Sequence, residues 1–260
     1  MFHCIAGSIG VAFQYMTNNT DQQNVILLLT RPLGGNERFC LKIKHLLYSC
    51  EILDNPIQKI DFLPSLSKVN KNSVLIFTSA NGLRAAKKHN LINKKCFVVG
   101  ANTKKIAVSF GYDVLGFSKD QENLLELIKS KKPTESMVHI RGKHTVGNLC
   151  DALKRSQFSC LDIIGYNQEP LKIKKQNLQK IQSGRPVILP VFSTRSAELL
   201  QSNLDLTGFN VIAISEAVAK IVTGVELGEL VISKKPDLNS MQEATLAILR
   251  RLIKFDGSTS

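Results

Sequence analysis

The chain has 260 residues, which is long for one small domain and suits two α/β units of about 120 residues each. Hydrophobic residues make up 43% and charged residues 21%, a composition that allows packed cores and excludes a low-complexity chain. Lys and Arg number 34 against 21 Asp and Glu, and this net charge of +13 favours an anionic ligand. Tryptophan is absent and aromatic residues make up only 6%, which argues against stacking of single-stranded nucleic acid.

The basic residues are dispersed in short groups, which we interpret as solvated helix ends, and we expect no nucleic-acid partner. The six cysteines never lie closer than ten positions apart, so C-x-x-C pairs and zinc-ligand spacing are both missing. We therefore expect reduced, mostly buried thiols and no metal site. No run of 18 apolar residues is present, so we expect no membrane span and a cytoplasmic protein.

Residues 1–24 precede the first clear structural signal. Their apolar part lacks a basic flank and a small-residue cleavage site, which argues against a signal peptide. Translation from Met16 would lose nothing structural. We therefore interpret residues 1–24 as a disordered extension.

From Val25 onward, short apolar runs alternate with segments of helical periodicity, as in parallel sheets covered by helices. A strand at 25–30, a turn containing Gly34 and Gly35, a helix and a strand at 50–53 form a first βαβ unit. The predicted helix carries Phe39, Ile43, Leu46 and Leu47 on one face. After Asn55 the pattern loosens, and we interpret this stretch as a crossing to a second lobe.

The second lobe contains strands predicted at 74–77, 96–99, 113–115, 137–140 and 160–166, alternating with helices at 102–110, 121–129 and 146–155. After Pro170 the alternation resumes with strands at 187–189, 211–214 and 230–233 and a helix at 238–255. Neither the first two strands nor the last three make a usual sheet alone. We therefore predict a discontinuous domain 1 (25–57 plus 167–256), with domain 2 (58–166) inserted and the two crossings side by side.

Several predicted strands end in small or hydroxyl residues that open a helix. The carboxyl ends of parallel strands form the crevice where ligands bind, and helix N-termini there favour carboxylate or phosphate. Taken singly, Ser79, Asn81, Asn102, Thr103 and Ser196 are better explained as helix caps, but five such ends in a basic protein favour an anionic ligand held largely by backbone. The candidates are Thr78, Ser79, Asn81, Gly100, Asn102, Thr103, Arg141, Gly142, Ser193, Arg195, Ser196 and Ser215.

Motifs of nucleotide, dinucleotide and hydrolase sites are missing, because neither G-x-x-x-x-G-K-[ST], G-x-G-x-x-G nor G-x-S-x-G occurs. No paired carboxylates stand out for acid–base work. An enzyme with this sequence is therefore expected to work by binding and shaping a reactive substrate.

A set of short motifs recurs in order along the chain. They are Thr30-Arg31-Pro32, the stretches 76–82 and 98–103, Arg141-Gly142, Tyr166, the stretch 192–197, and Pro236 before the last helix. In order and spacing, the chain resembles uroporphyrinogen-III synthase, the cofactor-free enzyme of tetrapyrrole synthesis, from residue 25 to about 255.

The resemblance implies two flavodoxin-like parallel-sheet lobes joined by a two-stranded β ladder, a HemD-like fold, with hydroxymethylbilane in the cleft between them. It implies a cyclising hydro-lyase that closes this linear tetrapyrrole with loss of water and inverts the last pyrrole ring. Tyr166 matches the family's tyrosine, whose phenol could hydrogen-bond the departing hydroxyl; simple packing at a strand end is the alternative. Arg31 and Arg141 are carboxylate-binding or turn-stabilising. We expect a monomer, with hydroxymethylbilane synthase as a candidate partner.

One turn departs from the family's pattern. Ser215-Glu216-Ala217-Val218 stands where the family often has Gly-Pro followed by threonines. Ser215 and Val218 stay substrate-binding candidates through their backbone, with Glu216 turned outward, unless another segment has taken over this role. The alternative function is a two-lobed binding protein that closes on an anionic ligand without turnover, and a basic nucleic-acid binder ranks third.

Overall fold

The computed structural model describes residues 25–32, 34–41, 43, 50–66, 69–92, 94–145 and 147–256. Residues 1–24, which we interpret as an extension, lie outside the described residues. The same holds for Leu46 and Leu47 of the first predicted helix and for Val146. The chain divides into two compact units: unit 1 is Met1–Lys59 with Pro170–Ser260, and unit 2 is Ile60–Glu169.

Unit 1 contains a sheet of five strands in the order β11-β10-β9-β1-β2, and every pair of neighbours is parallel. The strands are β1 (Ile26–Leu29), β2 (Glu51–Asp54), β9 (Val187–Val191), β10 (Asn210–Ala213) and β11 (Glu229–Ile232). The central strand β9 contains Pro190, which has no N–H to donate. Its pairing with β1 covers only Val187 and Ile188, so Pro190 lies beyond that ladder.

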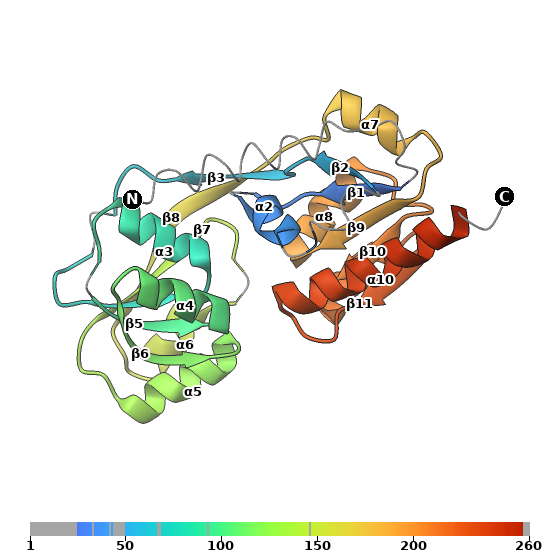
Figure 1. The fold of residues 1–260 in the computed structure, drawn as a ribbon. Helices are drawn as coiled ribbons and strands as arrows, with labels where there is room; N and C mark the ends of the chain where they lie inside the picture. The colour runs from blue at the N-terminus through green and yellow to red at the C-terminus, as the bar shows by residue number, and fades with distance from the viewer. Residues whose placement is uncertain are drawn as a thin grey trace. The chain divides into compact units, whose positions relative to one another are not determined.

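Helices cover both faces of this sheet (Figure 1). On one face, α2 (Gly35–Cys40) and α10 (Leu238–Asp256) bury Phe39, Met241 and Leu249 against the strands. On the other face lie α7 (Lys175–Ile181), α8 (Thr194–Asn203) and α9 (Glu216–Val222). The inner strands β1, β9 and β10 are therefore mostly apolar in sequence, because both of their faces are buried.

Unit 2 contains a sheet of six strands in the order β3-β8-β7-β4-β5-β6. The strands are β3 (Gln58–Phe62), β4 (Val74–Phe77), β5 (Lys95–Val99), β6 (Asp113–Ser118), β7 (Met137–Gly142) and β8 (Cys160–Pro170). The pairs from β8 to β6 are parallel. The chain passes from one unit to the other within β3 and β8, which are neighbours in this sheet.

The helices of unit 2 also lie on two faces. Helices α3 (Ala80–Lys88) and α4 (Ala101–Ser109) pack Leu83 and Ala107 on one side, and α5 (Gln121–Lys131) and α6 (Leu149–Arg155) pack Leu124 and Leu153 on the other. The prediction of an α/β fold with parallel sheets is confirmed.

Some elements differ from the expectation. Strand β8 continues four residues past Tyr166, because it pairs with β3, whose polar sequence did not indicate a strand. Helix α7 was missed because of its lysines, although Ile181 packs into the core.

The expectation of reduced thiols is wrong for one pair. Cys150 and Cys160 form a disulfide, because the start of α6 and the start of β8 bring their Cα atoms to 5.2 Å. Cys40, Cys50 and Cys96 are buried, and burial raises the pKa of each of these thiols to about 12.

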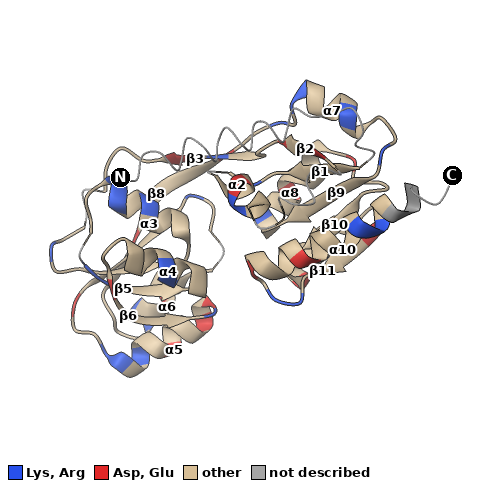
Figure 2. Ribbon diagram, in the orientation of Figure 1, with Lys and Arg blue, Asp and Glu red and all other residues tan. Residues whose placement is uncertain are grey.

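Basic residues are spread over helices and loops of both units, and the described part of the chain gathers them on no single element (Figure 2). Among the described helices, none combines the length and the apolar character that crossing a membrane requires.

Candidate functional site

The carboxyl ends of the parallel strands in unit 2 bring a serine and a tyrosine together. Ser79 follows β4 and caps α3, where its Oγ accepts a hydrogen bond from the Gly82 N–H at 3.3 Å. The same oxygen lies 2.8 Å from the Tyr166 hydroxyl of β8, although 87 positions separate the two residues. This edge of the sheet therefore holds a phenol in a fixed position beside a helix N-terminus.

An irregularity in β8 sets the direction of Tyr166. Arg141 pairs with Ile164 but Gly142 pairs with Tyr166, so Gly165 is an extra residue that shifts the alternation of side chains by one position. Tyr166 consequently joins the core on the side of α3, whereas Asp162 faces the opposite side with His139. A Cβ on Gly142 would lie 2.8 Å from the Tyr166 ring, so glycine is needed for this approach.

The environment of Tyr166 keeps its phenol protonated. The side chain is only 5% exposed, and this burial raises the pKa of the phenol above its ordinary value. Hydrogen bonding with Ser79 and with the Gly142 backbone acts in the opposite direction but does not cancel the effect of burial. At neutral pH Tyr166 is therefore a proton donor.

A series of hydrogen-bonded side chains on the other face of the sheet reaches the same edge. Thr78 Oγ1 lies 3.0 Å from His139 Nε2, and His139 Nδ1 lies 2.8 Å from Asp162 Oδ1. Arg141 Nε approaches the same carboxylate oxygen at 3.3 Å. The hydrogen bond from His139 lowers the pKa of the Asp162 carboxyl, with the charge of Arg141 acting in the same direction.

This geometry determines the direction of the hydrogen bond between Thr78 and His139. An ionised carboxylate only accepts hydrogen bonds, so Asp162 accepts one from the His139 Nδ1–H, and in this tautomer Nε2 accepts the hydrogen bond that the Thr78 hydroxyl donates. Thr78 and Arg141 were predicted from the sequence, whereas His139 and Asp162 were not. A histidine that interrupts the apolar run of β7 and an aspartate two positions inside β8 were the available signals, but their pairing depends on strand register.

The remaining candidate residues of unit 2 lie at the starts of α3 and α4, and some of them stabilise these helix starts. Asn81 Oδ1 accepts a hydrogen bond from Arg84 at 2.8 Å, and Thr103 is 7% exposed. Gly100 precedes α4 with φ 86°, a conformation that favours glycine, and Asn102 lies exposed in the first turn of that helix. The N-terminus of α4 therefore has a compact backbone with room beside it, because a Cβ on Gly100 would meet only Thr103, at 3.8 Å.

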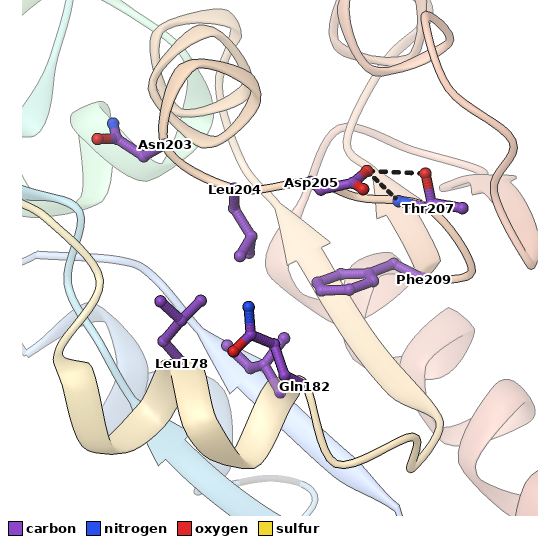
Figure 3. Close-up of a pocket in the computed structure, with 8 residues that line it drawn as sticks. Leu178, Gln182, Asn203, Leu204, Asp205, Thr207 and Phe209 are labelled. Atoms are coloured by element: carbon purple, nitrogen blue, oxygen red, sulfur yellow. Dashed lines mark hydrogen bonds between the residues drawn. The ribbon is translucent and has the colours of Figure 1, made fainter.

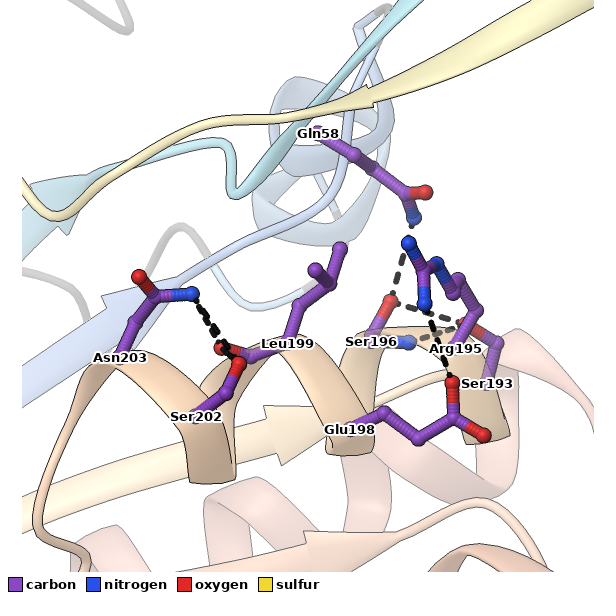
Figure 4. A network of polar contacts seen from close by, with 8 residues as sticks. All are labelled: Gln58, Ser193, Arg195, Ser196, Glu198, Leu199, Ser202 and Asn203. Carbon is purple, nitrogen blue, oxygen red and sulfur yellow. Dashed lines mark hydrogen bonds and ion pairs between the residues drawn. The ribbon is translucent and has the colours of Figure 1, made fainter.

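The corresponding edge of unit 1 is built from caps and an arginine (Figure 4). Ser193 caps α8 by accepting the Ser196 N–H at 3.1 Å, and the two hydroxyls are 2.8 Å apart. Gln58 Nε2 donates to Ser196 Oγ at 3.3 Å. Gln58 Oε1 and Arg195 Nε are buried and have no hydrogen-bond partner within the described parts of the chain. Such unmet polar atoms suit a polar ligand.

Arg31 lies at the same edge of unit 1. Its guanidinium stacks 4.1 Å above the Phe192 ring and donates to the Gly35 carbonyl at 3.3 Å. This arrangement fits the turn-stabilising alternative and leaves carboxylate binding a prediction.

The turn at 215–218 of unit 1 is the one whose sequence differs from the family's pattern. Its Glu216 side chain is exposed. Ser215 opens α9 without a side-chain cap, and the Val218 N–H already donates to the Ser215 carbonyl at 3.1 Å. Backbone binding by Ser215 and Val218 stays a prediction.

A pocket of about 420 Å³ lies elsewhere in unit 1 (Figure 3). Leu178 and Gln182 of α7 and the turn after it face Leu204 and Phe209 across it. Phe209 immediately precedes β10, so this pocket lies at the amino end of the strands, away from the candidate site.

Among the residues that the structure describes, one group of side chains could hold a metal ion. The ligand atoms of His139, Cys150 and Asp162 all lie within 4.8 Å of one another. The sequence did not indicate this group, because its members lie on three elements with no ligand spacing between them.

Known proteins are similar to this chain in sequence pattern and in fold. The family model HEM4, described as uroporphyrinogen-III synthase HemD, matches residues 49–243, well over half of the chain. No curated protein matches the sequence. Uroporphyrinogen-III synthetase from Helicobacter pylori is 14% identical with a TM-score of 0.63, and the match covers 87% of this chain and 99% of that one. A mutant uroporphyrinogen III synthase from Thermus thermophilus has the same identity and coverage and a TM-score of 0.53.

Proposed function

The chain belongs to the uroporphyrinogen-III synthase family, and we propose that it closes hydroxymethylbilane to uroporphyrinogen III, with Tyr166 as the residue that assists the departing hydroxyl. The observation that carries the role of Tyr166 is its 2.8 Å contact with Ser79 at the carboxyl ends of the strands in unit 2. This contact holds a protonated phenol at the edge where parallel-sheet proteins bind their ligands.

The reaction needs one proton for the leaving hydroxyl. As water departs, the pyrrole N–H of the same ring loses its proton, giving an azafulvene with no net change in protons. A phenol that keeps its proton at neutral pH can hydrogen-bond the hydroxyl as it leaves. Attack by the substituted carbon of the far ring, followed by fragmentation and recombination, then inverts the last ring.

Selection between products depends on how the substrate is held. Hydroxymethylbilane closes spontaneously to the uninverted isomer, so the protein must favour one attack over another by orientation. The acetate and propionate groups of the substrate are anions. The backbone at the start of α4 and Arg195 with its unpartnered Nε are the groups that we assign to them. Thr78 Oγ1, whose proton is donated to His139, is left to accept a hydrogen bond from a pyrrole N–H.

Several finer features belong to this proposal. Loss of water makes the enzyme a hydro-lyase. A monomeric, cytoplasmic protein that receives hydroxymethylbilane from hydroxymethylbilane synthase agrees with the family, because the substrate is short-lived outside an enzyme.

Turnover tests the proposal directly. Purified protein is incubated with freshly prepared hydroxymethylbilane, and the oxidised porphyrin isomers are separated by chromatography. The type III isomer is expected in large excess, whereas a control without protein gives type I. Exclusive formation of type I, with or without tight substrate binding, would refute the synthase and support the binding-protein alternative.

A further inference from the structure

We propose that unit 2 holds a site for one Zn²⁺ ion, formed by Cys150, Cys160, His139 and Asp162 once the Cys150–Cys160 disulfide is reduced. The proposal is independent of the synthase reaction, because it concerns a metal that the chain binds through its own side chains.

Strand register brings the four side chains to one face of the sheet. His139 of β7 pairs with Asp162 of β8, and Met137 pairs with Cys160, so His139, Asp162 and Cys160 share a face by the two-residue period of strands. Helix α6 covers this face and adds Cys150 from its second residue. Ligand atoms of His139, Cys150 and Asp162 lie within 4.8 Å of one another, and Cys160 is bonded to Cys150.

The donor set suits zinc. Two thiolates, one imidazole and one carboxylate make a four-coordinate site of the structural kind, in which ligand atoms stand about 2.0–2.3 Å from the ion. Two thiolates on one zinc ion are about 3.8 Å apart, a spacing that two neighbouring cysteines reach once the bond between them is broken. Cys150, Cys160 and His139 are at most 5% exposed, so the ion would be shielded from water.

The disulfide and the zinc ion exclude each other. A thiol reductant converts the disulfide to two cysteine thiols and becomes a disulfide itself. Zn²⁺ then binds both sulfurs and releases two protons. His139 Nδ1, which now faces Asp162, becomes a ligand, and its proton passes to Nε2. The hydrogen bond with Thr78 is then reversed, because Nε2 donates to Oγ1 instead of accepting from it.

Zinc titration of the full chain tests the proposal. Protein reduced with a phosphine, which replaces the thiol as reductant, is titrated with Zn²⁺ against a chromophoric chelator, and the oxidised protein is titrated in parallel. We expect one ion per chain, bound at least about 100-fold more tightly by the reduced form, since thiolates are the stronger ligands. Co²⁺ in place of Zn²⁺ should give the intense absorption of a tetrahedral thiolate complex.

Variants separate this site from other cysteines. Cys150→Ser and Cys160→Ser should each weaken binding at least about tenfold, and Asp162→Asn should weaken it as well. Cys96→Ala, which removes a free buried cysteine of the same unit, should leave the affinity unchanged. Equal affinity of the reduced and oxidised chains, or full affinity in Cys150→Ser, would overturn the proposal, and the first comparison needs no variant to fold.

Discussion

The two units share one build but differ in what stands where their strands end. In unit 2, two hydroxyls that follow β4 each contact a side chain from another strand: Thr78 contacts His139 of the neighbouring β7, and Ser79 contacts Tyr166 of β8, one strand further away. In unit 1, the equivalent strand β9 is followed by Ser193, which caps its own helix, and by Arg195, whose Nε is unpartnered within the described residues. We therefore expect unit 2 to assist proton transfer in addition to holding substrate anions at α4, and unit 1 to hold anions only.

The difference arises from single residues rather than from the fold. Both edges are made by parallel strands that run into helices, and both use a serine as the cap of the following helix. The extra residue Gly165 in β8 points Tyr166 toward Ser79, and unit 1 has no tyrosine at the described part of its edge. Substitutions at the two edges should consequently affect different kinetic constants.

The largest effect is expected for Tyr166→Phe. Removing the phenolic proton donor should lower kcat about 100-fold while KM changes little, because general-acid assistance acts in the transition state. Rates of uroporphyrinogen III formation at saturating substrate measure this loss. A variant with the kcat of the parent would show that Tyr166 only packs.

Tyr112→Phe is the matched control for this variant. Tyr112 is also 5% exposed and belongs to the same core, but its hydroxyl donates to the Leu91 carbonyl at 2.5 Å, away from the strand ends. Its loss should reduce the free energy of unfolding by about 1 kcal/mol and leave kcat unchanged. Tyr166→Phe also removes one hydrogen bond of a buried hydroxyl, so it should lose stability to a similar extent but lose kcat as well.

A smaller effect on turnover is expected at Thr78. Thr78→Val removes the hydroxyl that His139 orients and should lower kcat/KM about tenfold, the cost of one well-placed hydrogen bond. Thr78→Ser keeps the hydroxyl and should restore most of the activity. Equal rates for the serine and valine variants would mean that the methyl group matters here and the hydroxyl does not.

At the edge of unit 1, Arg195→Met should act on substrate binding. We expect KM to rise about three- to tenfold with kcat nearly constant, because a guanidinium that holds a carboxylate acts on the ground state and the transition state alike. Glu198→Gln, which removes the partner 3.3 Å from Arg195 Nη1, serves as the control and should leave KM within about twofold. A fall in kcat for Arg195→Met would contradict the proposal that the edge of unit 1 acts on substrate binding and the edge of unit 2 on the chemical step.

How far the sequence predicts this molecule depends on the range of the interactions involved. The apolar runs of β4, β5, β9 and β10 were identifiable because both faces of these strands are buried. Strand β3 was not, because its alternating polar sequence forms a strand only beside β8. The ends of elements likewise depend on neighbours that the sequence does not name.

The candidate site follows the same rule. Ser79 and Ser193 were predicted as residues between a strand end and a helix start, which is a local signal, although the cap of α8 was expected at Ser196 and lies at Ser193. His139, Asp162 and the Cys150–Cys160 bond were missed, because each requires the register of β7 against β8 or the position of α6 over them. The extra residue at Gly165 has no sequence signature beyond the glycine itself.

The smallest effect on turnover is expected at Glu51, which separates stability from catalysis in unit 1. Glu51 is 2% exposed at the first residue of β2, with Lys180 Nζ at 2.5 Å and Arg185 Nη1 at 2.7 Å. Hydrogen bonds and charges from Lys180 and Arg185 outweigh burial and lower the pKa of its carboxyl. The ionised group therefore stabilises the folded chain above the ordinary carboxyl pKa of about 4.3, and this contribution is lost as pH falls through the lowered folded pKa.

Glu51→Gln should accordingly reduce the free energy of unfolding by about 2 kcal/mol at pH 7, measured by urea denaturation, and the difference from the parent should shrink in acid. Turnover at neutral pH should not change, since Glu51 lies at the amino end of its strand, opposite the candidate site. A difference in stability that is the same at pH 7 and in acid would show that Glu51 acts by packing rather than by charge. A loss of kcat would mean that the ion pair also sets the position of the edge that carries Arg195.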